Sequence, residues 1–348
     1  MRLRNTLSAA LHRWLGNWPH RSPVDGLGEM RLFSLADLPL MLALSPRIYT
    51  ETARTLAAFR RNLTDRRWAG LQGVYSRDYM WGYAYLLFFW ARYCGALPQV
   101  IEYPDRILPA EMFLRYVCEI DNFIDDADTR AFWHGSPERL KLVPRAKVVL
   151  DELLQRLIRS SATLQSCRAV AALIADFRQR SFSVIVHPDA AHDGPQPAII
   201  RHKEATVGRL MRTWSLILAR SYQVEEGLAQ RASDVIFDAG MALQVIDDLS
   251  DAVVDYREGV ANLFLGVVRE RPDDWRLLCA QLGQSDDAYL SWLWVRQNIP
   301  RSYAAAIALR ESYLDRLLGQ GQAPGSSRTA ELLDEIIHVI RRLGYVNS

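Results

Sequence analysis

The chain has 348 residues, enough for one large domain or two small ones. Hydrophobic residues make up 49% of the chain and charged residues 24%, the profile of a globular protein that buries a substantial core. The formal net charge is only +2, so no strong basic field argues for nucleic acid as a partner.

The first 45 residues form a separate basic region in the sequence. Met1 to Trp18 alternates arginines with leucines, and we expect residues 1–45 to be an N-terminal arm or first helix, partly packed on the rest. Weak contact with a membrane surface is the alternative reading of this arm. The apolar run from Met80 to Cys94 is too short to cross a membrane and contains Arg92, so we expect a buried helix there.

The cysteines give no sign of a disulfide framework or a zinc site. They lie far apart, none belongs to a CxxC pair, and this usage fits a reduced, cytoplasmic interior. They are Cys94, Cys118, Cys167 and Cys279.

Apolar residues recur at steps of three and four along most of the chain, and strand-like alternation is scarce. This pattern predicts one all-α domain over residues 46–348. Proline- and glycine-rich breaks separate the helices. The expected helices cover residues 50–64, 78–95, 108–127, 143–160, 163–184, 200–222, 228–256, 272–282, 287–295, 299–318 and 329–343.

Two acidic clusters stand inside apolar helical stretches. In the first, Asp121 and Asp125 share one helix face, and in the second Asp247, Asp251 and Asp255 do so. Like charges four residues apart disfavour a helix, and burying them costs more unless a cation compensates. Because magnesium prefers oxygen ligands, two such faces across a helical bundle predict a site that holds metal ions against a diphosphate.

These clusters resemble the metal motifs of class I terpene synthases. Residues 121–125 read DNFID, which is similar to the aspartate-rich motif D-[D/N]-x-x-[D/E], and residues 247–255 match the spacing of [N/D]-D-x-x-[S/T]-x-x-x-[E/D]. Asp251 departs from the second pattern, since an aspartate there is the habit of polyprenyl diphosphate synthases. Gly259 and Asn262-Leu263 resemble residues that trail the cyclase motif.

The stretch Arg201 to Ala205 resembles a third element of bacterial cyclases. The resemblance implies that Arg201 senses the diphosphate, that Glu204 links it to a helix break, and that Ala205 presents its carbonyl to the substrate. Lys203 is the competing match, because polyprenyl synthases place a diphosphate-binding lysine in the corresponding helix. The C-terminal Arg-Tyr pair of the family has only approximate counterparts, of which Arg341, Arg342 and Tyr345 are the nearest.

Aromatic residues on the expected core helices are candidates for lining a cavity that stabilises a carbocation. Phe113 lies two turns before Asp121 on roughly the same face, and Trp214 lies on the Arg201 helix. We expect these two rings to contact the substrate.

The resemblance implies an all-α isoprenoid (terpenoid) synthase bundle with a central active-site cavity and about three magnesium ions. It implies a class I terpene synthase that ionises a C15 or C20 prenyl diphosphate and cyclises the cation. A homodimer is compatible with it. The alternative is a prenyltransferase of the same fold, of the polyprenyl diphosphate, squalene or phytoene synthase type.

Other sequence features help to distinguish these alternatives. The chain lacks the Gly-Gly-Lys-x-x-Arg-Pro stretch with which polyprenyl synthases hold isopentenyl diphosphate, and this disfavours chain elongation. A helical metal-dependent phosphohydrolase would need a His-Asp pair on a helix, whereas His192-Asp193 falls in an expected loop. A non-catalytic helical interaction protein is the remaining rival.

Overall fold

The computed structural model describes residues 86–107, 109–110, 113–114, 117, 164–182, 194–284, 290, 292–321 and 327–343. Every regular element in these ranges is a helix, as the sequence predicts. Residues 86–93 are helical. The elements that follow are α4 (Leu97–Glu102), η3 (Pro104–Ile107), α8 (Leu164–Phe177), η4 (Arg178–Phe182), α11 (Gln196–Lys203), η5 (Glu204–Gly208), α12 (Arg209–Ser221), α13 (Glu226–Ser250), α14 (Ala252–Glu258), α15 (Leu263–Arg269), α16 (Pro272–Gln284), α17 (Trp292–Asn298), α18 (Pro300–Gly321) and α19 (Ser327–Leu343).

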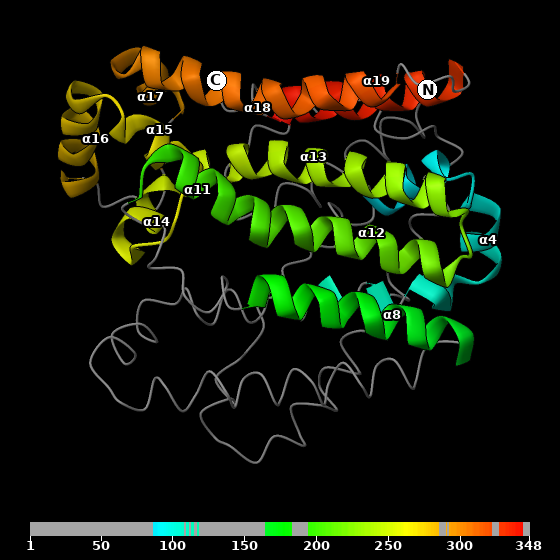
Figure 1. Ribbon diagram of the computed structural model, residues 1–348. Coiled ribbons are helices and arrows are strands. Elements are labelled where there is room, and N and C mark those ends of the chain that lie inside the picture. Colours follow the sequence, from blue (N-terminus) through cyan, green and yellow to red (C-terminus); the bar gives the residue numbers. More distant parts are fainter. Residues whose placement is uncertain are drawn as a thin grey trace, which may run out of the picture.

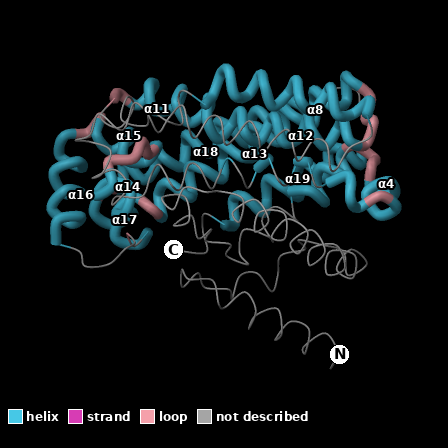
Figure 2. Tube along the Cα trace, turned by 90° about the horizontal axis from the view of Figure 1, so that it is seen from below, coloured by secondary structure: helices cyan, strands magenta, loops and turns pink. Residues whose placement is uncertain are grey.

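Helix α13 is the centre of the described bundle. It packs against α12 on one side and against α18 on the other, while α8 covers α12 and α19 covers α18. Figure 1 shows these helices stacked side by side, with α14 to α17 gathered at one end and α4 at the opposite end. The view turned by 90° in Figure 2 shows the same separation of the two ends.

Two apolar clusters fill the interior. The larger lies among α8, α12, α13, α18 and α19 and contains Trp90 and Trp214, both fully buried. The smaller lies at the far end of α13, where Leu249 and Val253 pack with residues of α15 to α18. The long apolar stripe of α13 thus serves both cores, which fixes the end of this helix against the group α14 to α17.

Several expected helices agree with the structure and others differ, and α4 forms where no helix was expected. The expected helix 228–256 is wrong as a single element, because α13 ends at Ser250 and α14 starts at Ala252. The expected helix 200–222 starts earlier, at Gln196, and contains the π-helical turn η5. Helix α15 was not expected, because its apolar residues show no periodicity: all its residues from Leu263 to Val268 are buried.

The expected arm 1–45 and the expected helices 50–64 and 143–160 lie outside the described residues. In the part of the chain that the structure covers, no helix is both long and apolar enough to span a membrane.

Candidate functional site

The second acidic stretch lies at the end of α13, where the helix bends. Asp251 stands between α13 and α14 with φ −91° and ψ 8°. The Asp251 N–H still donates to the Asp247 carbonyl at 2.9 Å, and the Asp255 N–H donates to the Asp251 carbonyl at 2.9 Å. The four-residue backbone connections therefore continue across the bend, and the three aspartates keep helical spacing.

The carboxyls of this stretch crowd one another. The Asp247 side chain reaches the surface, but protein atoms surround it closely. The resulting desolvation is the main reason that the pKa of Asp247 is raised to about 7, and the charges of Asp251 and Asp248 add to it. Burial and the charge of Asp248 raise the pKa of the Asp255 carboxyl to about 8. Carboxyls in such surroundings are poorly stabilised as anions, so a cation beside them would be attracted.

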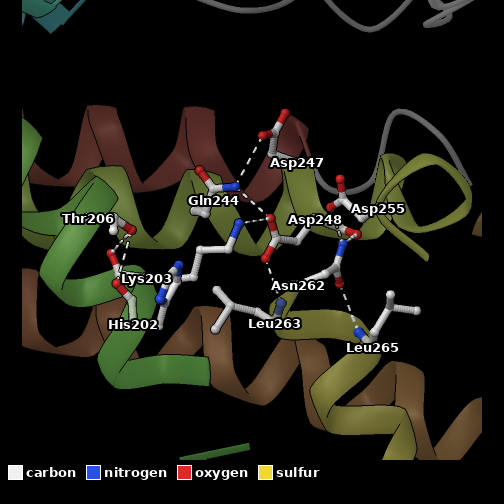
Figure 3. A network of polar contacts seen from close by, with 10 residues as sticks. All are labelled: His202, Lys203, Thr206, Gln244, Asp247, Asp248, Asp255, Asn262, Leu263 and Leu265. Carbon is white, nitrogen blue, oxygen red and sulfur yellow. Dashed lines mark hydrogen bonds and ion pairs between the residues drawn. The ribbon is translucent and has the colours of Figure 1, made fainter. Parts of the chain in front are cut away.

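Asp248, which the sequence analysis did not single out, turns inward and is 2% exposed. Its Oδ1 accepts from Lys203 Nζ at 3.1 Å and from Gln244 Nε2 at 2.6 Å. Its Oδ2 accepts from the Leu263 N–H at 2.6 Å. Figure 3 shows the Asp248 carboxylate between the Lys203 ammonium and the start of α15. Both oxygens of this buried carboxylate have donors, as burial of a charge requires.

Asn262 connects Asp248 with Asp255. Its Nδ2 donates to the Asp248 carbonyl at 2.5 Å and to Asp255 Oδ2 at 2.6 Å. Its Oδ1 accepts from the Leu265 N–H at 2.8 Å, so the same side chain caps the N-terminus of α15. The sequence signal for this role was the asparagine in front of an apolar run, which is typical of a helix start.

The side chains from Arg201 to Ala205 point toward different parts of the structure. Arg201 is exposed. Lys203 is buried on Asp248. Glu204 lies against α18, where its Oε1 accepts from the Tyr313 hydroxyl at 3.2 Å and lies 3.9 Å from Arg316 Nη2. Ala205 is half-buried in η5. The roles assigned to these residues by resemblance remain predictions.

A π-helical turn, η5, interrupts the helix directly after Lys203. The Thr206 hydroxyl donates to the His202 carbonyl at 3.0 Å, a local bond that competes with the helical ladder. At Gly208 a Cβ would stand 2.4 Å from Cε2 of Phe237, so α13 approaches η5 too closely for a larger residue. Such turns within helices occur often at functional sites.

The two aromatic candidates lie in the apolar core. Phe113 is 1% exposed and packs edge-on against Phe177 at 5.1 Å between ring centroids, and Trp214 is fully buried. Their expected contact with a substrate stays a prediction. At the C-terminus Arg342 belongs to α19, but its side chain is not described, and Tyr345 lies outside the described residues.

The first acidic cluster lies outside the described residues, since Asp121 and Asp125 fall in the range 118–163. His192-Asp193 falls outside as well. Within the described ranges, no three histidine, cysteine, aspartate or glutamate side chains come together as a metal-binding group. The donors present at the α13 bend are carboxylate oxygens, the ligands that magnesium prefers, and their crowding suits a cation. These residues therefore fit magnesium in the type of donor atom that they supply.

Neither a protein-family model nor a curated protein matches the chain. Two solved structures are similar to it over most of its length. Octaprenyl pyrophosphate synthase from Helicobacter pylori is 14% identical with a TM-score of 0.52, and the match covers 84% of this chain and 99% of that one. Polyprenyl synthase from Caulobacter crescentus, complexed with calcium and isoprenyl diphosphate, is 15% identical with a TM-score of 0.56, and the match covers 88% of this chain and 97% of that one.

The similarity spans nearly the full length of both solved structures, and every described element of this chain is helical. The sequence prediction of the fold is thereby confirmed. The chain has the all-helical isoprenoid synthase fold.

Proposed function

We propose that the chain is a magnesium-dependent enzyme that ionises the diphosphate ester of an allylic prenyl substrate. The observation that carries this proposal is the second acidic stretch at the α13 bend, where Asp247, Asp251 and Asp255 keep helical spacing beside a buried lysine. Bound magnesium would neutralise the charge of the departing diphosphate. The aspartates of the bend would hold it on one wall, and Asp121 and Asp125 on the other.

The cation that would contact the diphosphate is Arg201 rather than Lys203. The Lys203 ammonium is bonded to the Asp248 carboxylate, and its side chain is 11% exposed. Moving it to a substrate would leave the Asp248 carboxylate buried with one fewer donor, which is costly. Arg201 is exposed two residues earlier and can move without that cost.

Prenyl transfer is the first candidate for the fate of the allylic cation. The two similar solved structures support it, because one is an octaprenyl pyrophosphate synthase and the other is a polyprenyl synthase complexed with calcium and isoprenyl diphosphate. Asp251, in the position where polyprenyl synthases have an aspartate, agrees with this branch. The missing Gly-Gly-Lys-x-x-Arg-Pro stretch points to an acceptor other than isopentenyl diphosphate, such as a second molecule of the allylic substrate.

Cyclisation is the second candidate, and the turn η5 favours it. The cyclase resemblance links Glu204 to a helix break, and a π-helical turn interrupts the helix from Glu204 to Gly208. In this branch the cation would react with double bonds of its own chain, until a proton is lost or water adds. Ala205, at the start of the turn, would present its carbonyl to the cation.

Incubation with magnesium and single prenyl diphosphates tests the proposal. Geranyl, farnesyl and geranylgeranyl diphosphates are supplied alone and with isopentenyl diphosphate, while pyrophosphate release and products are measured by coupled assay and gas chromatography–mass spectrometry. Pyrophosphate release from at least one substrate is expected. A monomeric hydrocarbon or alcohol identifies a cyclase, and a product joined from two substrates identifies a transferase.

The paired variant Asp247→Ala with Asp255→Ala tests the acidic wall. Losing about 4 kcal/mol of transition-state charge stabilisation would lower the rate roughly 10³-fold. Asp273→Ala is the matched control, because that aspartate is 89% exposed on α16. Full activity in the paired variant, or no pyrophosphate from any substrate with the wild type, would contradict the proposal.

A further inference from the structure

We infer that Asn262 is a positioning residue that sets the direction in which the Asp255 carboxylate faces a bound metal ion. This inference rests on the proposed function, because it concerns the same acidic wall. Asn262 is not itself a ligand in this view, since its amide nitrogen is turned toward Asp255 and can only donate.

The contacts of Asn262 leave its amide one orientation. Nδ2 faces two acceptors, the Asp255 carboxylate and the Asp248 carbonyl, while Oδ1 faces the Leu265 N–H. Turning the amide over would set an oxygen against two oxygens and a nitrogen against an N–H. The side chain is 1% exposed, so water cannot take over these bonds.

Asn262 is in turn held from two sides. The neighbouring Leu263 N–H donates to Asp248 Oδ2, and Lys203 of α11 bonds the other oxygen of the same carboxylate. Helix α15 also packs closely on α11, because a Cβ at Gly266 would stand 2.7 Å from Cδ1 of Ile199. The backbone that carries Asn262 is therefore fixed relative to the α13 bend.

The consequence for Asp255 is that one of its two oxygens is fixed by a hydrogen bond. The other oxygen of Asp255 therefore faces a defined direction before a metal ion binds. Hydrogen bonds of this kind to a ligating group are worth about 10–100-fold in metal affinity. Asp247 receives a comparable bond from Gln244 Nε2, but at 3.2 Å and from an exposed pair.

The substitution Asn262→Ser tests the role. Serine is a good N-cap, so α15 keeps a side-chain acceptor for its first turn, whereas its shorter side chain does not carry the amide donor that reaches Asp255. Binding of Mn²⁺ in the presence of inorganic pyrophosphate is measured by calorimetry, together with the magnesium dependence of turnover and the melting temperature without metal. We expect the half-saturating Mn²⁺ concentration to rise about tenfold.

Val268→Ala is the matched control. Val268 is fully buried on the same helix, so the substitution weakens the packing of α15 and leaves the bond between Asn262 and Asp255 in place. We expect its half-saturating Mn²⁺ concentration to stay within about twofold of the wild type, because the hydrogen bond to Asp255 is kept. Loss of such a bond to a metal ligand would change the affinity about 10–100-fold. Equal shifts in the two variants, or no shift in Asn262→Ser, would overturn the inference.

Asn262→Thr is the second variant, in case the serine variant does not fold. Threonine also keeps a capping oxygen and lacks the amide donor, without adding a charge, so its effect on Mn²⁺ binding should match that of serine. If the wild type binds Mn²⁺ and turns over substrate while both variants bind like the wild type, only the inference fails. If the wild type neither binds Mn²⁺ with pyrophosphate nor releases pyrophosphate from prenyl substrates, the proposed function fails and the inference falls with it.

Discussion

Two polar clusters on α13 differ in how they bury a carboxylate. The bend cluster (Lys203, Gln244, Asp248, Asp255 and Asn262) lies at the C-terminal end of the helix, and the α18 cluster (Glu204, Asp238, Tyr313 and Arg316) lies about three turns earlier. Each contains one buried aspartate of α13, and each includes one residue from the start of η5 or the end of α11. Lys203 and Glu204 are neighbours in the chain, yet they belong to different clusters.

The cations of the two clusters have different surroundings. In the bend cluster the Lys203 side chain is 11% exposed, and the Asp248 carboxylate also accepts from a backbone N–H. In the α18 cluster the Arg316 side chain is 49% exposed and lies 2.9 Å from Asp238. Burial is the main reason that the pKa of Asp238 is raised to about 6. The two buried carboxylates thus differ in the exposure of the cation that each pairs with.

The largest expected effect is a loss of unfolding free energy when the cation of the bend cluster is removed, compared with removal of the cation of the α18 cluster. Lys203→Met leaves the Asp248 carboxylate buried without its ammonium, and removing one partner of a buried pair costs about 3–5 kcal/mol of unfolding free energy. Arg316→Met removes a half-exposed partner and should cost about 1 kcal/mol. Urea unfolding at pH 7 measures both. A loss for Arg316→Met as large as that for Lys203→Met would contradict the comparison.

The next prediction concerns η5, which joins the two clusters. Gly208→Ala places a methyl group against the Phe237 ring, and overpacking of this kind costs about 1–3 kcal/mol. Gly319→Ala on α18 is the control, because a Cβ there meets nothing within 4 Å. Alanine should stabilise that helix by roughly 0.5–1 kcal/mol. Thermal unfolding of both variants checks the signs, and a gain in stability at position 208 would show that η5 is not held by close packing.

The smallest expected effect is a pH dependence at Asp238. Its folded-state pKa of about 6 lies above the ordinary value of 3.8, so the folded state binds the proton more tightly and stability falls as pH rises from about 4 to about 6. Between pH 5 and pH 7 the unfolding free energy of the wild type should fall by about 1 kcal/mol relative to Asp238→Asn, which does not titrate. Unfolding curves at the two pH values give this difference. If the difference in unfolding free energy between the wild type and Asp238→Asn is the same at both pH values, Asp238 titrates normally.

The helices could be predicted to a large extent from local pattern. The amphipathic repeats of α8, α12, α18 and α19 appear in the sequence because one face of each is apolar. Helix α15 was missed for the opposite reason, since a helix buried on all sides has no polar face to mark its period. The bend at Asp251 was missed because the apolar pattern continues through it into Ala252 and Val253.

The candidate site could be predicted only in part. The spacing of Asp247, Asp251 and Asp255 is a local property and was read correctly as helical. Asp248 was overlooked, because neighbouring helical residues point in different directions and the shared face of Asp247, Asp251 and Asp255 does not include it. Its role depends on Lys203, which is 45 residues away, and on Asn262, which is 14 residues away.

By itself, the sequence determined that the chain is helical and that Asp247, Asp251 and Asp255 keep helical spacing, because periodicity and i, i+4 spacing depend on neighbours along one helix. Only the tertiary structure decided which carboxylate is buried, which cation it pairs with, and which asparagine orients Asp255. These choices depend on α11 and α15 meeting at the end of α13, and such long-range contacts leave no periodic trace in the chain.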